Sequence, residues 1–298
     1  MSRVREILVT GGGGQLGREL QRHAWPDRWS IVATTSAELD LRDPGALATK
    51  VAERPWAAVI NAAAYTAVDR AETEVVAAWG VNALGPAALA AACRDAGVPI
   101  VHVSTDYVFD GEREGAWRED DRPRPLGVYG ASKLGGELAV ASAGGRYAIV
   151  RTAWVISANG SNFVKTMLRL AADRDVVRVV ADQHGAPTSA ADLAAALATI
   201  AMRLAEDDAA PSGTYHFSNA GRATWFELAA AVFEGSARRG APACVAEPIA
   251  TIDYPTPARR PRNSLLAHDA IRRDYGVEPR AWRVALDDIL DELIGRPR

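Results

Sequence analysis

A tyrosine and a lysine four residues apart form the first pair whose types and spacing suit catalysis. Tyr129 and Lys133 make a Tyr-x-x-x-Lys pattern at the start of a predicted helix, so one turn brings both side chains to the same face. A phenol with a pKa near its usual value of about 10 is a poor proton source at neutral pH, and a neighbouring ammonium favours its ionised form. The pair therefore predicts a general acid for a carbonyl group undergoing reduction, with a surface Tyr/Lys pair as the alternative.

Hydroxyl side chains end a predicted buried strand at residues 100–104. Ligands of open α/β sheets collect at the carboxyl ends of the strands. We therefore expect Thr105, or Ser104 as the alternative, to hydrogen-bond the substrate oxygen that Tyr129 protonates. A strand-end hydroxyl that only caps a turn is the competing interpretation.

A glycine-rich segment follows the first predicted strand, at residues 7–9. Gly11, Gly14 and Gly17 have the spacing G-x-x-G-x-x-G and lead into a predicted helix from about residue 15 to 23. Glycine has no Cβ, so the backbone can turn tightly and approach a pyrophosphate, whose charge then lies at the N-terminus of the helix. The pattern predicts a dinucleotide ligand.

The end of the second predicted strand, at residues 33–36, carries no carboxylate of the kind that binds the ribose hydroxyls in NAD-specific folds. Arg18 and Arg28 are candidates to lie near this point. We therefore expect NADPH as the cofactor, with NADH also accepted.

The elements that must position these residues alternate between strands and helices. Predicted strands at residues 7–9, 30–34, 57–60, 100–104 and 146–152 alternate with helices, including one at 75–96 that Gly97 ends. This alternation predicts an α/β fold of Rossmann type, a doubly wound parallel sheet. Residues 1–150 form the expected dinucleotide-binding domain, and 151–298 a smaller, mixed α/β substrate lobe. A strand at 176–180 and a helix at 191–205 are expected to return to the first domain.

Composition narrows the function classes. The chain has 298 residues, 48% hydrophobic and 24% charged, with a formal net charge of -3 and only two cysteines. Interspersed charges of both signs give no basic stripe for nucleic acid or a membrane surface, so neither is an expected partner. Two cysteines exclude a disulfide framework and a cysteine zinc site. With no signal-peptide pattern at the start, we expect a cytoplasmic protein.

These residues resemble the extended short-chain dehydrogenases/reductases and, within them, the family of dTDP-4-dehydrorhamnose reductases. The resemblance extends over nearly the whole chain. The segments that carry it are residues 11–17, 61–69, 104–109, 129–133, 151–155, 182–188 and 254–261.

The resemblance implies NADPH-dependent reduction of the C4 keto group of dTDP-4-dehydro-β-L-rhamnose, which yields dTDP-β-L-rhamnose in dTDP-L-rhamnose biosynthesis. Tyr129 would be the proton donor, Lys133 would hold the nicotinamide ribose, and Thr105 would complete the catalytic set. The implied cofactor-binding residues are Gly11, Gly14, Gln15, Leu16, Gly17, Asp40, Leu41, Ala62, Ala63, Ala64, Tyr65, Tyr129 and Lys133. The implied substrate-binding residues are Val68, Asp69, Thr105, Asp106, Trp154, Arg259 and Arg260.

The three arginines at 259, 260 and 262 suit a nucleotide diphosphate, because an arginine fork can donate two hydrogen bonds to phosphate oxygens. Solvated loop arginines are the alternative. The resemblance also raises a magnesium-bridged dimer, for which Glu19 and Glu292 match two positions. Ala191 stands at the third and has no carboxylate. We therefore expect the protein to be a monomer or a homodimer, and we assign no metal site.

Four other functions compete with this interpretation. A sugar-nucleotide dehydratase needs an Asp-Glu pair after the strand-end threonine, and here Tyr107 follows Asp106, so this function is disfavoured. A sugar-nucleotide epimerase, or another reductase of the same superfamily, keeps the same Tyr/Lys pair and stays open. A non-catalytic NADP-binding regulatory subunit is the alternative from another class, and the intact Tyr129, Lys133 and Thr105 favour catalysis over it.

Overall fold

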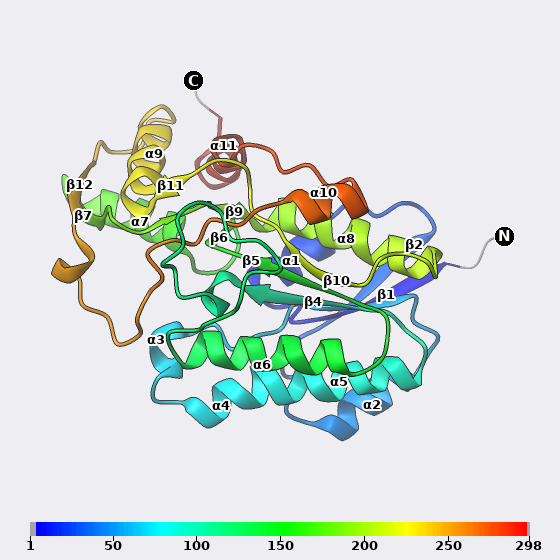
Figure 1. The fold of residues 1–298 in the computed structure, drawn as a ribbon. Coiled ribbons are helices and arrows are strands. Elements are labelled where there is room, and N and C mark those ends of the chain that lie inside the picture. Colours follow the sequence, from blue (N-terminus) through cyan, green and yellow to red (C-terminus); the bar gives the residue numbers. More distant parts are fainter. Residues whose placement is uncertain (1–3, 297–298) are drawn as a thin grey trace.

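A six-stranded parallel sheet forms the centre of the molecule in the computed structural model, which describes residues 4–296 (Figure 1). The strands lie in the order β10-β5-β4-β3-β1-β2. Their bounds are β1 (Arg5–Thr10), β2 (Trp29–Thr34), β3 (Ala58–Asn61), β4 (Ile100–Thr105), β5 (Tyr147–Thr152) and β10 (Gly213–His216). The chain runs outward in one direction from β1 to β2 and in the other from β3 onward, which creates the switch point where doubly wound folds bind ligands. The predicted Rossmann-type fold is confirmed.

Helices cover both faces of the sheet (Figure 1). One face packs against α1 (Gln15–Arg22) and α8 (Ala190–Glu206). The other is covered by α2 (Pro44–Ala52), α4 (Val75–Trp79), the π-helical η1 (Gly80–Leu84), α5 (Gly85–Asp95) and α6 (Val128–Ser142). Because both faces are covered, the strands carry nearly continuous apolar runs such as Ile7, Leu8 and Val9, all fully buried.

The predicted helix at 75–96 is the continuous run α4–η1–α5. Of residues 4–296, this run, Val75–Asp95, is the one helical stretch with the length and apolar content to cross a membrane, a criterion that core helices also meet. Here α5 packs against α2 and α6.

One expected strand pairing is wrong. The strand β7 (Val176–Val180) does not return to the main sheet but pairs in parallel with β12 (Val245–Ile249), and β10 takes the edge position beside β5. Val176 and Arg178 are exposed, so one face of β7 is solvated, unlike the strands of the covered sheet. The expected helix at 191–205 does return, because α8 packs on β3, β4 and β5.

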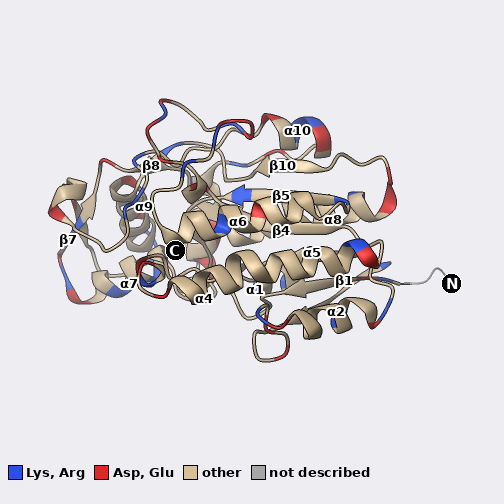
Figure 2. Cartoon of the chain, turned by 60° about the horizontal axis from the view of Figure 1, so that its bottom comes forward, with Lys and Arg blue, Asp and Glu red and all other residues tan. Residues whose placement is uncertain are grey.

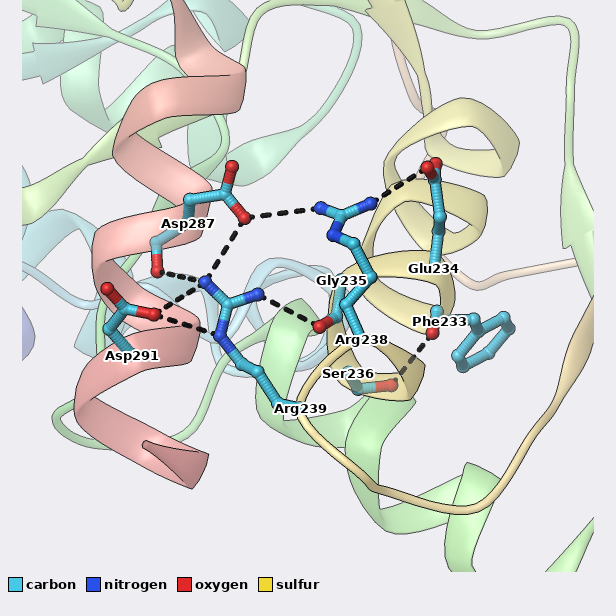
Figure 3. Close-up of polar contacts among 8 residues, drawn as sticks. All are labelled: Phe233, Glu234, Gly235, Ser236, Arg238, Arg239, Asp287 and Asp291. Atoms are coloured by element: carbon cyan, nitrogen blue, oxygen red, sulfur yellow. Dashed lines mark hydrogen bonds and ion pairs between the residues drawn. The ribbon is translucent and has the colours of Figure 1, made fainter. Parts of the chain in front are cut away.

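A second hydrophobic core lies beyond the carboxyl ends of the strands. It is built from α7 (Phe163–Asp173), α9 (Trp225–Ala237), α11 (Trp282–Ile294) and the β7/β12 pair. At the end of α9, Arg239 reaches across to Asp287 and Asp291 on α11 (Figure 3). The remaining elements are α3 (Val68–Ala71), η2 (Asp106–Val108), β6 (Val155–Ile156), β8 (His184–Gly185), β9 (Thr188–Ser189), β11 (Ala223–Thr224), η3 (Thr251–Asp253) and α10 (Asp269–Tyr275).

Charges of both signs gather in loops and at helix ends, as Figure 2 shows. The helices α4 and η1 carry none, and α5 carries only Arg94 and Asp95 at its end. The interspersed pattern agrees with the near-neutral composition.

Candidate active site

A cavity of about 720 Å³ opens at the carboxyl ends of β1, β3, β4 and β5. It brings together segments far apart in the sequence, because all these parallel strands end at the same edge of the sheet. Most of the predicted site residues line it: Gly11, Gly14, Gln15, Leu16, Asp40, Leu41, Ala62, Ala63, Ala64, Tyr65, Val68, Thr105, Asp106, Tyr129, Lys133 and Trp154.

The glycine turn requires its glycines for close backbone approach. Gly11 has φ +79°, and a Cβ there would lie 2.6 Å from the nitrogen of Ala63. A Cβ at Gly17 would lie 2.2 Å from the carbonyl oxygen of Gly11. Gly14 precedes α1 as its N-cap residue, and no side chain caps that end. The first amide groups of α1 are therefore open to a phosphate group at the cavity wall.

Hydroxyls and one paired carboxylate form the far end of the cavity. Thr35 and Ser36 follow β2 and line it together with Asp40, whose carboxylate is bound by the Arg42 guanidinium at 2.6 Å. Arg18 donates from Nε to the carbonyl of Gly13, another lining residue, at 3.1 Å. The other arginine candidate does not lie here: Arg28 pairs with Glu206 at the end of α8.

The predicted proton donor, Tyr129, lies on the first turn of α6 beside the end of β4. Its ring meets that of Tyr107 edge to face, with centroids 5.4 Å apart. Burial raises the pKa of Tyr129 well above its usual value, and the charge of Asp106 raises it further, whereas a hydrogen bond with Thr105 lowers it. Tyr129 therefore keeps its proton at neutral pH until a strong base such as an alkoxide forms beside it.

Lys133 is almost completely buried, with 2% of its surface exposed. Its Nζ donates to the carbonyl oxygen of Val103 on β4, at 2.7 Å. Burial lowers the pKa of Lys133 to about 8, and the nearby carboxylate of Glu137 opposes this shift. The pKa of Tyr129 is shifted by burial and by Thr105, Asp106 and Tyr107. Lys133 is not among these causes, so its effect on the pKa of the tyrosine stays a prediction.

Glu72 fixes the start of the helix that carries this pair. Its Oε1 accepts the backbone N–H of Val128, the first residue of α6, at 2.9 Å. A carboxylate at a helix N-terminus satisfies an otherwise free amide and interacts favourably with the helix dipole. The sequence interpretation missed this residue, because it lies 56 positions before its partner.

Three buried oxygens at the ends of β4 and β5 have no hydrogen-bond partner among the described residues: Ser104 Oγ, Asp106 Oδ2 and Thr152 Oγ1. All three residues line the cavity. Buried polar atoms without partners are rare in proteins, so three at one site indicate that a polar ligand or water completes them. Ser104 was predicted only as an alternative to Thr105, and Thr152 had no predicted role.

Trp154 lies at the cavity wall in an unusual conformation. It is the one residue other than glycine with a positive φ between residues 4 and 296, at +49°. Its ring stacks on that of Trp225 with centroids 3.7 Å apart, and a Cβ on Gly185 would lie 2.6 Å from it. A backbone strained in this way and held by tight packing is typical of ligand sites.

The predicted phosphate-binding arginines lie outside the cavity lining. Arg260 forms an ion pair with Asp69 at 2.8 Å and contacts the Tyr107 hydroxyl at 3.4 Å. Asp69 also accepts the backbone N–H of Ala258, so it holds this loop against α3. Both predicted substrate contacts, Asp69 and Arg260, are therefore paired with each other in this structure. Arg259 makes no contact that assigns it a role.

The glutamates raised for magnesium have other partners. Glu19 is buried and accepts from Ser157 Oγ at 2.7 Å and Asn159 Nδ2 at 2.8 Å, while Glu292 pairs with Arg22 at 2.6 Å. Across residues 4–296, no group of three or more His, Cys, Asp or Glu side chains is arranged to hold a metal. Both glutamates are thus paired within the chain, and the magnesium-bridged dimer stays a prediction.

The family described as the RmlD substrate binding domain matches residues 5–294 of this chain. A dTDP-4-dehydrorhamnose reductase of Burkholderia thailandensis is 44% identical over 98% of this chain and 100% of its own length. The corresponding protein of Escherichia coli is 40% identical, over 96% and 97%.

Solved structures show the same likeness. A dTDP-4-dehydrorhamnose reductase of Bacillus anthracis in complex with NADP superposes with a TM-score of 0.90, at 35% identity over 97% of this chain and 99% of that one. A dTDP-glucose 4,6-dehydratase of Streptomyces venezuelae, at 22% identity and a TM-score of 0.77, shares the fold.

Proposed function

This chain belongs to the dTDP-4-dehydrorhamnose reductase family, and from that premise we propose that it reduces the C4 keto group of dTDP-4-dehydro-β-L-rhamnose with NADPH. The observation that carries the proposal is the placement of Tyr129 and Thr105 side by side in a cavity whose other end is the glycine turn. An NAD(P)H-dependent oxidoreductase needs this arrangement, because hydride donor and proton donor must reach one carbonyl group together.

The residues present fit a dinucleotide. The glycine turn at Gly11 and Gly17 leaves room at the backbone, Gly14 begins an uncapped helix end, and the cavity extends from there past Ala62 and Ala63 to Lys133. Asp40 and Leu41 would contact the adenine side, and Lys133 the nicotinamide ribose. When bound, the reduced cofactor supplies the hydride.

The preference for NADPH is supported by the hydroxyls of Thr35 and Ser36 at the end of β2, where a carboxylate would repel the 2′-phosphate. Arg18 lies beside Gly13 and would contribute the positive charge. The Bacillus anthracis relative is described with NADP, in agreement with this. Comparison of kcat/KM for NADPH and NADH measures the preference.

The roles of the chain's own side chains follow from their surroundings. Tyr129 keeps its proton at neutral pH and gives it to the oxygen at C4 as negative charge develops there. The Thr105 hydroxyl holds the tyrosine and the same oxygen in place. Trp154 would pack against the sugar. Arg260 would leave its ion pair with Asp69 and bind the diphosphate of the substrate instead.

Replacement of Tyr129 by Phe tests the proposal. We expect Tyr129→Phe to lower kcat by roughly 10²–10⁴-fold, the usual contribution of a general acid, because only the hydroxyl is removed. NADPH affinity, measured by fluorescence titration, should change little. The assay follows the loss of reduced-nicotinamide absorbance with dTDP-4-dehydro-β-L-rhamnose.

Three outcomes would contradict the proposal. No NADPH oxidation by the parent protein on this sugar nucleotide would leave the regulatory-subunit alternative. Conversion of the sugar without net NADPH consumption would indicate an epimerase. Full activity in Tyr129→Phe would show that another group supplies the proton.

A further inference from the structure

A buried ion pair joins Arg151 on β5 to Glu137 on α6. The guanidinium donates from Nε to Glu137 Oε1 at 2.9 Å and from Nη2 to Oε2 at 2.7 Å. The two side chains are 5% and 4% exposed, and no other ion pair among residues 4–296 has both members buried. A buried ion pair contributes little to stability, because the cost of removing two charges from water offsets their attraction. Stability alone therefore does not explain this pair.

Three further contacts fix the guanidinium of Arg151, which makes it an anchor for Glu137. Its Nη1 donates to His216 Nε2 and to the backbone carbonyl of Glu119, each at 3.4 Å. The guanidinium also lies over the ring of Phe109, 5.0 Å from the centroid. Because arginine can only donate, His216 accepts at Nε2, as a neutral imidazole does. The place of the cation is thus set by β10 and by the segment that follows η2.

Glu137 and the lysine of the proposed site lie one turn apart on the inner face of α6. Lys133 and Glu137 are separated by four residues, a spacing that places their side chains next to each other, and both are buried. Their partners on the sheet are also neighbours. Lys133 Nζ donates to the carbonyl oxygen of Val103 on β4. The next residue of that strand, Ser104, lies opposite Arg151 on β5. The Glu137 carboxylate is therefore the anion beside the buried ammonium.

We propose that Glu137, held in place by Arg151, is a positioning residue that keeps Lys133 charged at the cavity wall. This role rests on the proposed reduction, in which the ammonium holds the nicotinamide ribose. Lys133 lines the cavity and Glu137 does not, so the carboxylate acts through the lysine. A lone ammonium is costly to bury, and a fixed carboxylate one turn away offsets part of that cost.

The titratable groups around Lys133 agree with this role. Burial lowers the pKa of Lys133 to about 8, and the charge of Glu137 opposes this shift. His102 on β4 is neutral, because burial and the charge of Lys133 both lower its pKa. The other titratable side chains on α6 and on the elements packed against it are Asp69, Arg70, Cys93, Arg94, Asp95, Asp106, Tyr107, Tyr129, Tyr147 and Arg151. None of these is among the causes of the lysine shift, so loss of the Glu137 carboxylate should lower the pKa of Lys133 further.

Titration of the lysines tests the inference without turnover. The chain has three lysines, so isotope labelling of the lysine ε-carbons gives three NMR signals, which Lys50→Arg and Lys165→Arg assign. We expect the Lys133 signal of the full-length chain to titrate at about pH 8. Glu137→Gln keeps the shape of the side chain and removes its charge, so it should lower this midpoint by about one pH unit or more. The alkaline fall in kcat/KM for NADPH should move in the same direction.

A double variant, Glu137→Leu with Arg151→Met, separates positioning from stability. Apolar residues of similar volume often replace a buried ion pair without loss of stability. The double variant should therefore stay folded. Its Lys133 midpoint should lie between those of the parent and of Glu137→Gln, because it lacks the carboxylate but also lacks the unpaired guanidinium that the single variant retains.

The matched control is Arg239→Met, which breaks the ion pairs of another buried arginine, between α9 and α11 and outside the cavity lining. It should lower the urea midpoint and leave the Lys133 titration at the parental pH. A parental Lys133 midpoint in both Glu137 variants would overturn the inference. Failure of both to fold would assign the pair to stability alone and overturn it as well. Inactivity of a parent protein whose lysine titrates as expected would instead overturn the proposed reduction.

Discussion

At the scale of single residues, Tyr129 and Lys133 share a helical turn but have different partners. Tyr129 faces Thr105 and the Asp106 carboxyl group, while the Lys133 ammonium donates to the backbone of β4. The two side chains are both buried, which shifts their pKa values in opposite directions because burial disfavours the charged form of each. A separate pH dependence is therefore expected for each residue.

The lysine predicts a loss of activity at alkaline pH. The pKa of Lys133 is lowered to about 8, so the ammonium that would hold the ribose is lost above that pH. We expect kcat/KM for NADPH to fall by about tenfold for each pH unit above this value, because this parameter reports groups of the free enzyme. Initial rates over a pH series measure it. A constant value up to about pH 10, the range of an unshifted lysine, would contradict the prediction.

At the scale of elements, an ion-pair network links α9 and α11 at the edge of the second hydrophobic core (Figure 3). The guanidinium of Arg239 donates to Asp291 Oδ1 at 2.6 Å and 2.9 Å, to the backbone carbonyl and Oδ1 of Asp287, and to the Gly235 carbonyl. Its side chain is 2% exposed. Arg238, the next residue, pairs with Glu234 and Asp287 but is 47% exposed.

These two arginines make a matched pair of variants. We expect Arg239→Ala to lower the free energy of unfolding by about 2–4 kcal/mol, because five hydrogen bonds and the packed stem are lost from a buried position. Arg238→Ala should cost less than about 1 kcal/mol, as for exposed ion pairs. Urea unfolding followed by tryptophan fluorescence measures both. Equal losses would show that burial of Arg239 does not determine its contribution.

At the scale of the whole molecule, buried histidines couple the fold to pH. His102 and His216 are fully buried, and burial lowers the pKa of each well below its usual value. His268 accepts from the backbone N–H of Ser218 at 3.2 Å, and burial lowers its pKa to about 4. All three are held neutral in the folded state, while an unfolded histidine gains a proton below about pH 6.5.

The fold should therefore lose stability in mild acid. For a histidine whose folded pKa is depressed, the contribution is complete above the unfolded pKa and is lost as the pH falls toward the folded one. For His268 alone, the loss between pH 7 and pH 4.5 is roughly 2–3 kcal/mol. We expect His268→Gln to reduce the difference between urea-derived unfolding free energies at these two pH values by about that amount. An unchanged difference would contradict the assignment.

The sequence by itself determined the features that depend on neighbours along the chain. Strand and helix periodicity predicted β1 to β5 and the long helix from Val75, and the spacing of Gly11, Gly14 and Gly17 predicted the turn that lines the cavity. The expected return of the strand at 176–180 was wrong. Its exposed face carries Arg178 and suits a strand covered on one side only, and packing selects the partner β12.

Tertiary structure alone decided which side chains have partners. Glu72 holds the start of α6 from 56 residues away, Asp69 forms an ion pair with Arg260, and Asp106 has no ion-pair partner among residues 4–296. None of these contacts could be predicted from a sequence motif, because the partners have no characteristic spacing along the chain. The physical reason is that the pKa of a group and the pairing of a charge depend on burial and on distances in space. The folded sheet determines these distances, because it brings the carboxyl ends of its parallel strands together at one edge.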